Sequence, residues 1–118
     1  MVPADVLEEQ WRASAAAAAS YSGVDGVAEL RRAAEARTRR LGDAVERAGG
    51  TVPGRTLTAR SERVEDVLAA ERRALEVHVA GVGQLGAREY RSLLAGVIAG
   101  SAAAESALLE RLDRPPAP

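Results

Sequence analysis

Apolar residues recur with a period of about 3.6 residues along four segments of this chain. No segment shows the alternation of apolar and polar residues that is typical of a strand. The period predicts helices over about 6–21, 26–48, 62–85 and 87–112. At 118 residues, the chain is long enough for one domain with its own core. The sequence therefore predicts an all-α fold, a four-helix bundle over residues 1–114, followed by a disordered Pro-rich tail, 115–118.

The segment between the second and third helices, residues 49–60, decides the topology. Antiparallel neighbours need only a short turn. A helix of ~23 residues is ~34 Å long, and a dozen extended residues reach ~40 Å. The segment is therefore long enough to cross the whole bundle, which would make the second and third helices parallel and join two hairpins by one long crossover. A loose loop in a simple up-down-up-down bundle is the alternative.

Composition removes several classes of function. The formal net charge of −1 argues against nucleic acid or an anionic membrane as a partner held by bulk charge. The chain has no cysteine, and hence neither a disulfide framework nor a thiolate metal site. The most apolar run, Leu93–Ala104, falls short of the ~20 residues that span a bilayer, so no membrane span is expected. A cytoplasmic location is the default, and an exported form with a trimmed signal stays open.

Several stretches resemble a known family. The runs AEARTRRL at 34–41 and VERAGGTVP at 45–53 resemble the second helix and the start of the crossover in ferritin-like proteins. VEDVLAAERRA at 64–74 resembles their third helix, and YRSLLAGVIA at 90–99 resembles the beginning of their fourth. After Gly26, most of the chain is similar to small actinobacterial ferritin-like domains of unassigned function with a degenerate metal site.

This resemblance implies where metal ligands would lie. In di-iron members, two helices each give one Glu, and the other two each give Glu-x-x-His. The resemblance places these positions on Ser14, Glu71, Ala34 with Arg37, and Ser101 with Ala104. A shift of one residue in the second helix would place Glu35 and Thr38 there instead. Because either register keeps few carboxylates and no histidine, the resemblance implies a lost metal centre, no cofactor and no di-iron chemistry.

Five polar residues are expected in the core: Ser14, Arg37, Glu71, His78 and Ser101. Glu71 and His78 lie about two turns, ~10 Å, apart on one helix face, so they would bind one ion only with ligands from other helices. A weak mononuclear site of Glu71, His78 and Glu35 is one interpretation. The other pairs Glu71 with Arg37 or with a hydroxyl such as Ser14 or Ser101, because a buried carboxylate needs a donor. His78 would then fill the place of an aromatic side chain.

Small residues dominate the first and fourth helices, at Ala15–Ala19, Gly96, Gly100 and Ala102–Ala104. They permit close helix packing, an apolar cavity for a ligand, or a homodimer contact through the alanine face of the first helix. No nucleophile–base pair or phosphate-binding loop occurs. We therefore expect a non-catalytic structural or protein-interaction module, with a homodimer or another protein as partner. The alternative is a residual mononuclear metal-binding or small apolar ligand-binding protein.

Overall fold

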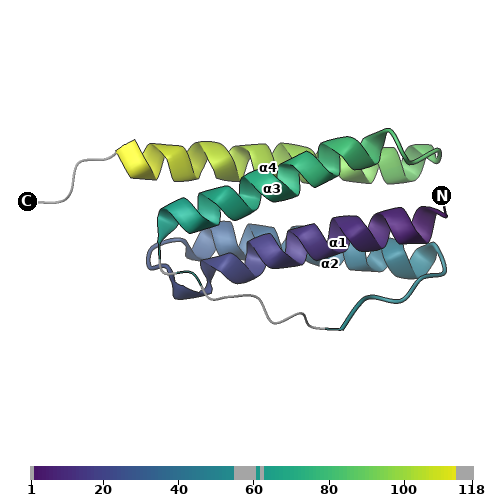
Figure 1. Cartoon of the computed structure of the whole chain (residues 1–118), viewed down its shortest axis with the longest axis horizontal. Coiled ribbons are helices and arrows are strands. Elements are labelled where there is room, and N and C mark those ends of the chain that lie inside the picture. The colour runs from purple at the N-terminus through teal and green to yellow at the C-terminus, as the bar shows by residue number, and fades with distance from the viewer. Residues whose placement is uncertain (1, 55–60, 62, 114–118) are drawn as a thin grey trace, which may run out of the picture.

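The computed structural model describes residues 2–54, 61 and 63–113, and four long helices dominate it (Figure 1). Their bounds are α1 Pro3–Ser20, α2 Ala28–Arg47, α3 Val64–Val82 and α4 Arg88–Asp113, with a short 3₁₀ turn η1, Tyr21–Gly23, after α1. The described residues contain no strand. The all-α four-helix bundle predicted from the sequence is confirmed. The predicted tail, 115–118, lies outside the described residues.

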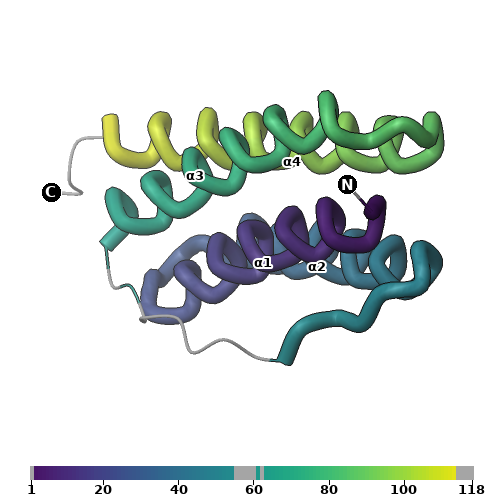
Figure 2. Tube along the Cα trace, turned by 45° about the vertical axis from the view of Figure 1, so that its right-hand side comes forward, coloured from purple at the N-terminus to yellow at the C-terminus, as the bar shows by residue number. Residues whose placement is uncertain are grey.

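The connectivity joins two antiparallel hairpins. α1 and α2 run in opposite directions, as do α3 and α4, whereas α2 and α3 point the same way (Figures 1 and 2). α2 ends at the opposite end of the bundle from the start of α3, so the chain crosses the length of the bundle between them (Figure 1). Of the crossover predicted over 49–60, residues 55–60 lie outside the described part.

Each helix has two packing neighbours. α1 packs against α2 and α3, and α4 packs against α3 and less closely against α2. α2 and α3, like α1 and α4, therefore lie diagonally across the bundle. Contacts between diagonal helices pass through the core, so the residues that make them have to be long enough to reach across it.

Local chemistry explains how α1 begins and α2 ends. Pro3 occupies the first turn of α1, where its missing N–H is not needed by the helix. After α2, Gly49 adopts a φ of 87°, a left-handed conformation that suits glycine. This turn lets the Gly50 N–H donate to the Val45 carbonyl at 2.9 Å and satisfies one of the last carbonyls of the helix.

The apolar core forms two large clusters at opposite ends of the bundle and a small alanine cluster, Ala17, Ala70 and Ala74, between α1 and α3. One large cluster contains residues near the start of α1, the end of α2, the turn between α3 and α4, and the start of α4: Val6, Leu7, Leu41, Ala44, Val45, Leu85, Leu94 and Val97. The other contains residues from the opposite ends of the helices: Ala18, Tyr21, Val27, Ala34, Val67, Leu68 and Leu108. Between the two large clusters, each helix contributes buried polar residues, which form a polar layer at mid-height. Ser20, at the end of α1, is also buried but lies outside this layer.

Candidate functional site in the buried polar layer

The polar layer draws on all four helices. The five residues singled out in the sequence are between 0 and 4 % exposed, and they are Ser14, Arg37, Glu71, His78 and Ser101. Gln10 of α1 is a sixth, also buried. Because burying polar groups costs free energy unless they are hydrogen-bonded, the partners of these residues decide what the layer does.

Glu71 is held by two donors on one oxygen. An Nη2 proton of Arg37 is donated to Oε2 of Glu71 at 2.7 Å, and the Tyr21 hydroxyl donates to the same oxygen at 2.6 Å. Both bonds are charge-assisted and short, which makes them the strongest in the layer. Burial, and then the adjacent Glu71 carboxylate, raise the pKa of the Tyr21 phenol far above its ordinary value. The phenol therefore stays protonated and remains a donor.

A glycine of α4 makes room for Arg37. A Cβ placed on Gly100 would lie 2.9 Å from Cδ of Arg37, closer than carbon atoms approach without displacement. The arginine stem therefore lies across the backbone of α4 at this point and extends its guanidinium towards α3. The pairing of Arg37 with Glu71 thus depends on α4 carrying no side chain at residue 100.

A second glycine of the layer accommodates Gln10. The amide carbon Cδ of Gln10 lies 2.7 Å from where a Cβ of Gly81 would stand. Gln10 Oε1 and His78 Nδ1 are 2.8 Å apart, so with the amide oxygen as acceptor the imidazole donates from Nδ1. This assignment leaves Nε2 of His78 as the unprotonated nitrogen.

His78 is neutral at pH 7. Burial lowers the pKa of its imidazole, the Arg37 charge lowers it further, and the result is a pKa of about 4. Three buried polar atoms of the described chain have no hydrogen-bond partner, and they are Oε1 of Glu71, Nε2 of His78 and Oγ of Ser101. The layer therefore keeps acceptor capacity on α3 beyond the bonds it already makes.

Ser14 was considered from the sequence as a hydroxyl partner of Glu71, but the two side chains do not pair. Its Oγ lies 2.8 Å from Oγ1 of Thr38, and the Thr38 hydroxyl also lies 3.0 Å from the carbonyl of Ala34. On α2, Ala34 and Arg37 point inward. Glu35 has a side chain that is 45 % exposed and pairs with Arg31 at 3.6 Å, so it lies away from Glu71.

The donor set of the layer does not fit a di-iron centre. Among residues 2–54, 61 and 63–113, no group of three or more His, Cys, Asp or Glu side chains is placed to hold a metal ion. Oε2 of Glu71 already accepts two hydrogen bonds. The fixed positive charge of Arg37 opposes a cation beside that carboxylate. The chemistry available here is ion pairing and hydrogen bonding within the core.

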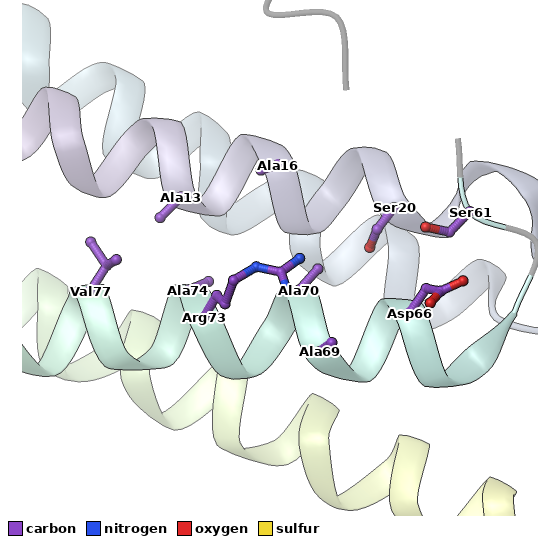
Figure 3. A pocket seen from close by; sticks show the side chains of 10 residues that line it. All are labelled: Ala13, Ala16, Ser20, Ser61, Asp66, Ala69, Ala70, Arg73, Ala74 and Val77. Atoms are coloured by element: carbon purple, nitrogen blue, oxygen red, sulfur yellow. The ribbon is translucent and has the colours of Figure 1, made fainter. Parts of the chain in front are cut away.

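A groove runs between α1 and α3, and half of the ten residues that line it are alanines (Figure 3). Its volume is about 600 Å³. Ala13 and Ala16 of α1 face Ala70 and Ala74 of α3, and Ser20, Ser61 and Asp66 gather at one end. The side chain of Arg73 extends along the middle of the groove. Deeper in the same seam, Ala17 is buried against α3. The alanines of α1 therefore pack closely with α3 and also leave an accessible groove above the contact.

No family model, curated protein or solved structure matches this chain. Function therefore has to be argued from the polar layer and the surfaces of the bundle.

Sequence reasoning missed the buried Gln10 and the bond from Tyr21 to Glu71. The signal for Gln10 was the glycine opposite it: a glycine inside a helix weakens that helix, so Gly81 indicates a close neighbour. Tyr21 lies on the apolar stripe of the predicted first helix, and the stripe alone names no partner for its hydroxyl. Its place at the end of α1, level with Glu71 of α3, depends on how the helices align along the bundle, which the sequence period does not define.

Proposed function

We propose that this chain is a metal-free, ferritin-like four-helix bundle that serves as a structural or protein-interaction module. Two hairpins joined by one long crossover are the connectivity of ferritin-like bundles, which supports the relationship suggested by the sequence resemblance. In this reading, an ion pair has replaced the metal centre at the heart of the bundle.

The observation that carries the proposal is the position of Arg37. In the aligned di-iron pattern, residue 37 would be a histidine ligand, and residue 71 a glutamate ligand. Here the guanidinium of Arg37 contacts the Glu71 carboxylate at 2.7 Å, with both side chains nearly inaccessible to solvent. The arginine supplies the positive charge that Glu71 needs, so the core is neutralised without an ion.

The test is metal content measured by mass spectrometry. The purified protein is analysed before and after incubation with one equivalent of iron, manganese or zinc. We expect no stoichiometric retention of any of the three. Retention that disappears in both Glu71→Gln and His78→Gln would overturn the proposal in favour of a mononuclear site at the free Oε1 and Nε2 atoms. The exposed Glu35→Gln variant is the matched control, because Glu35 lies outside the layer.

A second function, binding of a small apolar ligand, is favoured by the alanine-lined groove. The groove is open to solvent along the α1–α3 seam and has Ser20, Ser61 and Asp66 at one end. The Arg73 guanidinium lies at its middle, an arrangement that suits an alkyl chain whose acidic head pairs with Arg73. A fatty acid should then raise the melting temperature of the wild type. The fatty acid should leave the melting temperature of the Ala16→Glu variant unchanged, because this substitution places a charge among the alanines of the groove.

A further inference from the structure

α4 has two apolar faces, and the bundle covers only one of them. The buried face contains Leu94, Val97, Ser101, Ala104 and Leu108. The opposite face is exposed and consists of small uncharged residues: Ser92, Ala95, Ala99, Ala102, Ala103 and Ser106. An 18-residue window of α4 has a mean hydropathy of 1.6, yet only 28 % of that window is buried. By length and composition alone, α4 is apolar enough to cross a membrane, and the described bundle leaves its outer apolar face without a partner.

The apolar surface extends beyond the small residues. Leu109 of α4 is 37 % exposed, and Val79 of α3 is 56 % exposed. The ion pair between Arg72 and Glu105, at 3.4 Å, shows which residues of the antiparallel helices α3 and α4 lie level with each other. Two turns from that pair, Val79 of α3 and Ile98 of α4 come level with each other. The outer face of α4 therefore continues sideways onto α3.

Charged residues of opposite sign lie at the two ends of this face. Arg88 and Arg91 are exposed at its beginning, and Glu110 and Asp113 are exposed at its end. Their spacing in the helix places all four on the same side as the small residues. If two copies of α4 are laid antiparallel and centred on the middle of the helix, Arg88 of each copy faces Asp113 of the other. A parallel pair would place like charges together.

We propose that a second copy of this chain docks antiparallel on the outer face of α4, related by a two-fold axis near the middle of the helix. This deepens the proposed function by naming the partner of the interaction module, and it rests on that proposal. The small side chains allow the two helices to approach to ~8 Å. A two-fold axis makes the interface self-complementary, so both ends gain the same charge pairs.

The chemistry of the face favours a second copy over a lipid surface. Helices that lie on membranes present bulky Trp, Phe or Leu on the apolar side and Lys or Arg on the polar side. The outer face of α4 presents mainly Ala, Ser and Gly, with acidic residues at one end. Because a single pair of helices buries less than the ~1,200 Å² of a standard stable interface, we expect a dimer of moderate affinity that dissociates on dilution.

The experiment is sedimentation equilibrium of the full chain over a concentration series. We expect a reversible monomer–dimer equilibrium in the wild type. Ala99→Glu lies next to the two-fold axis, where it brings two carboxylates together, and should raise the dissociation constant by ~10-fold or more. Ala33→Glu, at an exposed alanine of α2, is the matched control and should leave it unchanged. Unaltered helicity shows that each variant folds.

A charge exchange tests the register. Arg88→Glu alone should weaken the dimer, and Arg88→Glu with Asp113→Arg should restore it. Both changes suit the helix ends at which they lie, so α4 itself is not weakened. A monomer at all concentrations, a dimer insensitive to Ala99→Glu, or binding of the monomer to phosphatidylcholine–phosphatidylglycerol vesicles would each overturn the inference. Metal retention is measured in a separate experiment. A protein that is monomeric and retains no metal would therefore refute the dimer interface and leave the proposal of a metal-free bundle standing.

Discussion

The guanidinium of Arg37 and the carboxylate of Glu71 meet at 2.7 Å across the diagonal of the bundle, between α2 and α3. These helices belong to different hairpins and have little other contact. Tyr21, at the end of α1, donates to the same carboxylate oxygen. The interaction therefore fastens one hairpin to the other through the core. Compared with apolar residues of the same volume, a buried pair of this kind adds little net stability, and we expect its role to be to define the arrangement of the helices.

Removing one partner of this pair should destabilise the protein strongly. Glu71→Gln leaves the Arg37 charge buried without compensation, and we expect a loss of about 3–5 kcal/mol in the free energy of unfolding. The measurement is urea denaturation followed by circular dichroism. A change close to zero would show that the carboxylate is neither buried nor paired.

Replacing both partners by apolar residues should recover much of that loss. Arg37→Met with Glu71→Leu removes both charges and keeps the volume filled, and such replacements are often neutral or stabilising. If the pair defines the alignment of the hairpins, the double variant should be stable but less uniquely packed. Broadened amide resonances in its NMR spectrum would show this, and a spectrum as sharp as that of the wild type would contradict it.

The two glycines of α4 should respond oppositely to alanine. Gly100→Ala gains about 1 kcal/mol of helix propensity. Its Cβ would, however, collide with the stem of Arg37, which is buried and bound at its far end. Overpacking of this kind costs about 1–3 kcal/mol, so we expect a net loss of stability. Gly96→Ala meets no atom within 4 Å and is the matched control. It should stabilise the monomer by about 0.5–1 kcal/mol in urea denaturation at low protein concentration.

The helices and the inward positions of the polar residues were predictable from the sequence because both follow from the 3.6-residue period. The period placed Glu71, His78 and Ser101 on the same stripes as the leucines, and the structure buries all three. It also favoured the register of α2 in which residues 34 and 37 point inward. The length of the crossover was enough to suggest the parallel arrangement of α2 and α3.

The partners within the layer were harder to predict because they depend on how far the helices slide along one another. Arg37 was named as a partner for Glu71 by charge alone, whereas the pairing of Ser14 with Thr38 depends on the vertical alignment of α1 and α2. The exposure of the outer face of α4 was hard to predict from the sequence for another reason. Alanine and glycine suit buried and exposed helix faces alike, so the period does not distinguish them.

Tyr21→Phe should isolate the contribution of one hydrogen bond to Glu71. The variant keeps the ring in the apolar cluster and removes the hydroxyl that donates at 2.6 Å. A hydrogen bond to a charged group is worth about 1.5–3 kcal/mol, and we expect a loss of that size in the free energy of unfolding. Combined with Glu71→Gln, the loss should be smaller than the sum of the two single losses, since both act on one network. Tyr90→Phe, at the other tyrosine of the chain, is the control.

His78 should make the stability of the protein depend on pH in the acid range. Burial and the Arg37 charge lower the pKa of the folded imidazole to about 4, from 6.5 in the unfolded chain. Between these values the unfolded chain binds a proton that the folded chain does not, so stability rises with pH. The contribution is fully present above pH 6.5 and is lost as the pH falls towards 4. The shift corresponds to roughly 3 kcal/mol over this window.

Two measurements check this prediction. The chain has a single histidine, so its imidazole resonance in an NMR titration needs no assignment by mutagenesis, and it should titrate near 4 in the folded protein. Carboxylates also gain protons over this range, which is why the free energy of unfolding is compared between the wild type and His78→Gln at each pH. The difference between the two proteins should shrink as the pH falls from 6.5 to 4, because only the wild type has an imidazole to protonate. A folded imidazole that titrates near 6.5 would mean that it reaches solvent, and the neutral hydrogen bond to Gln10 would then no longer describe the core.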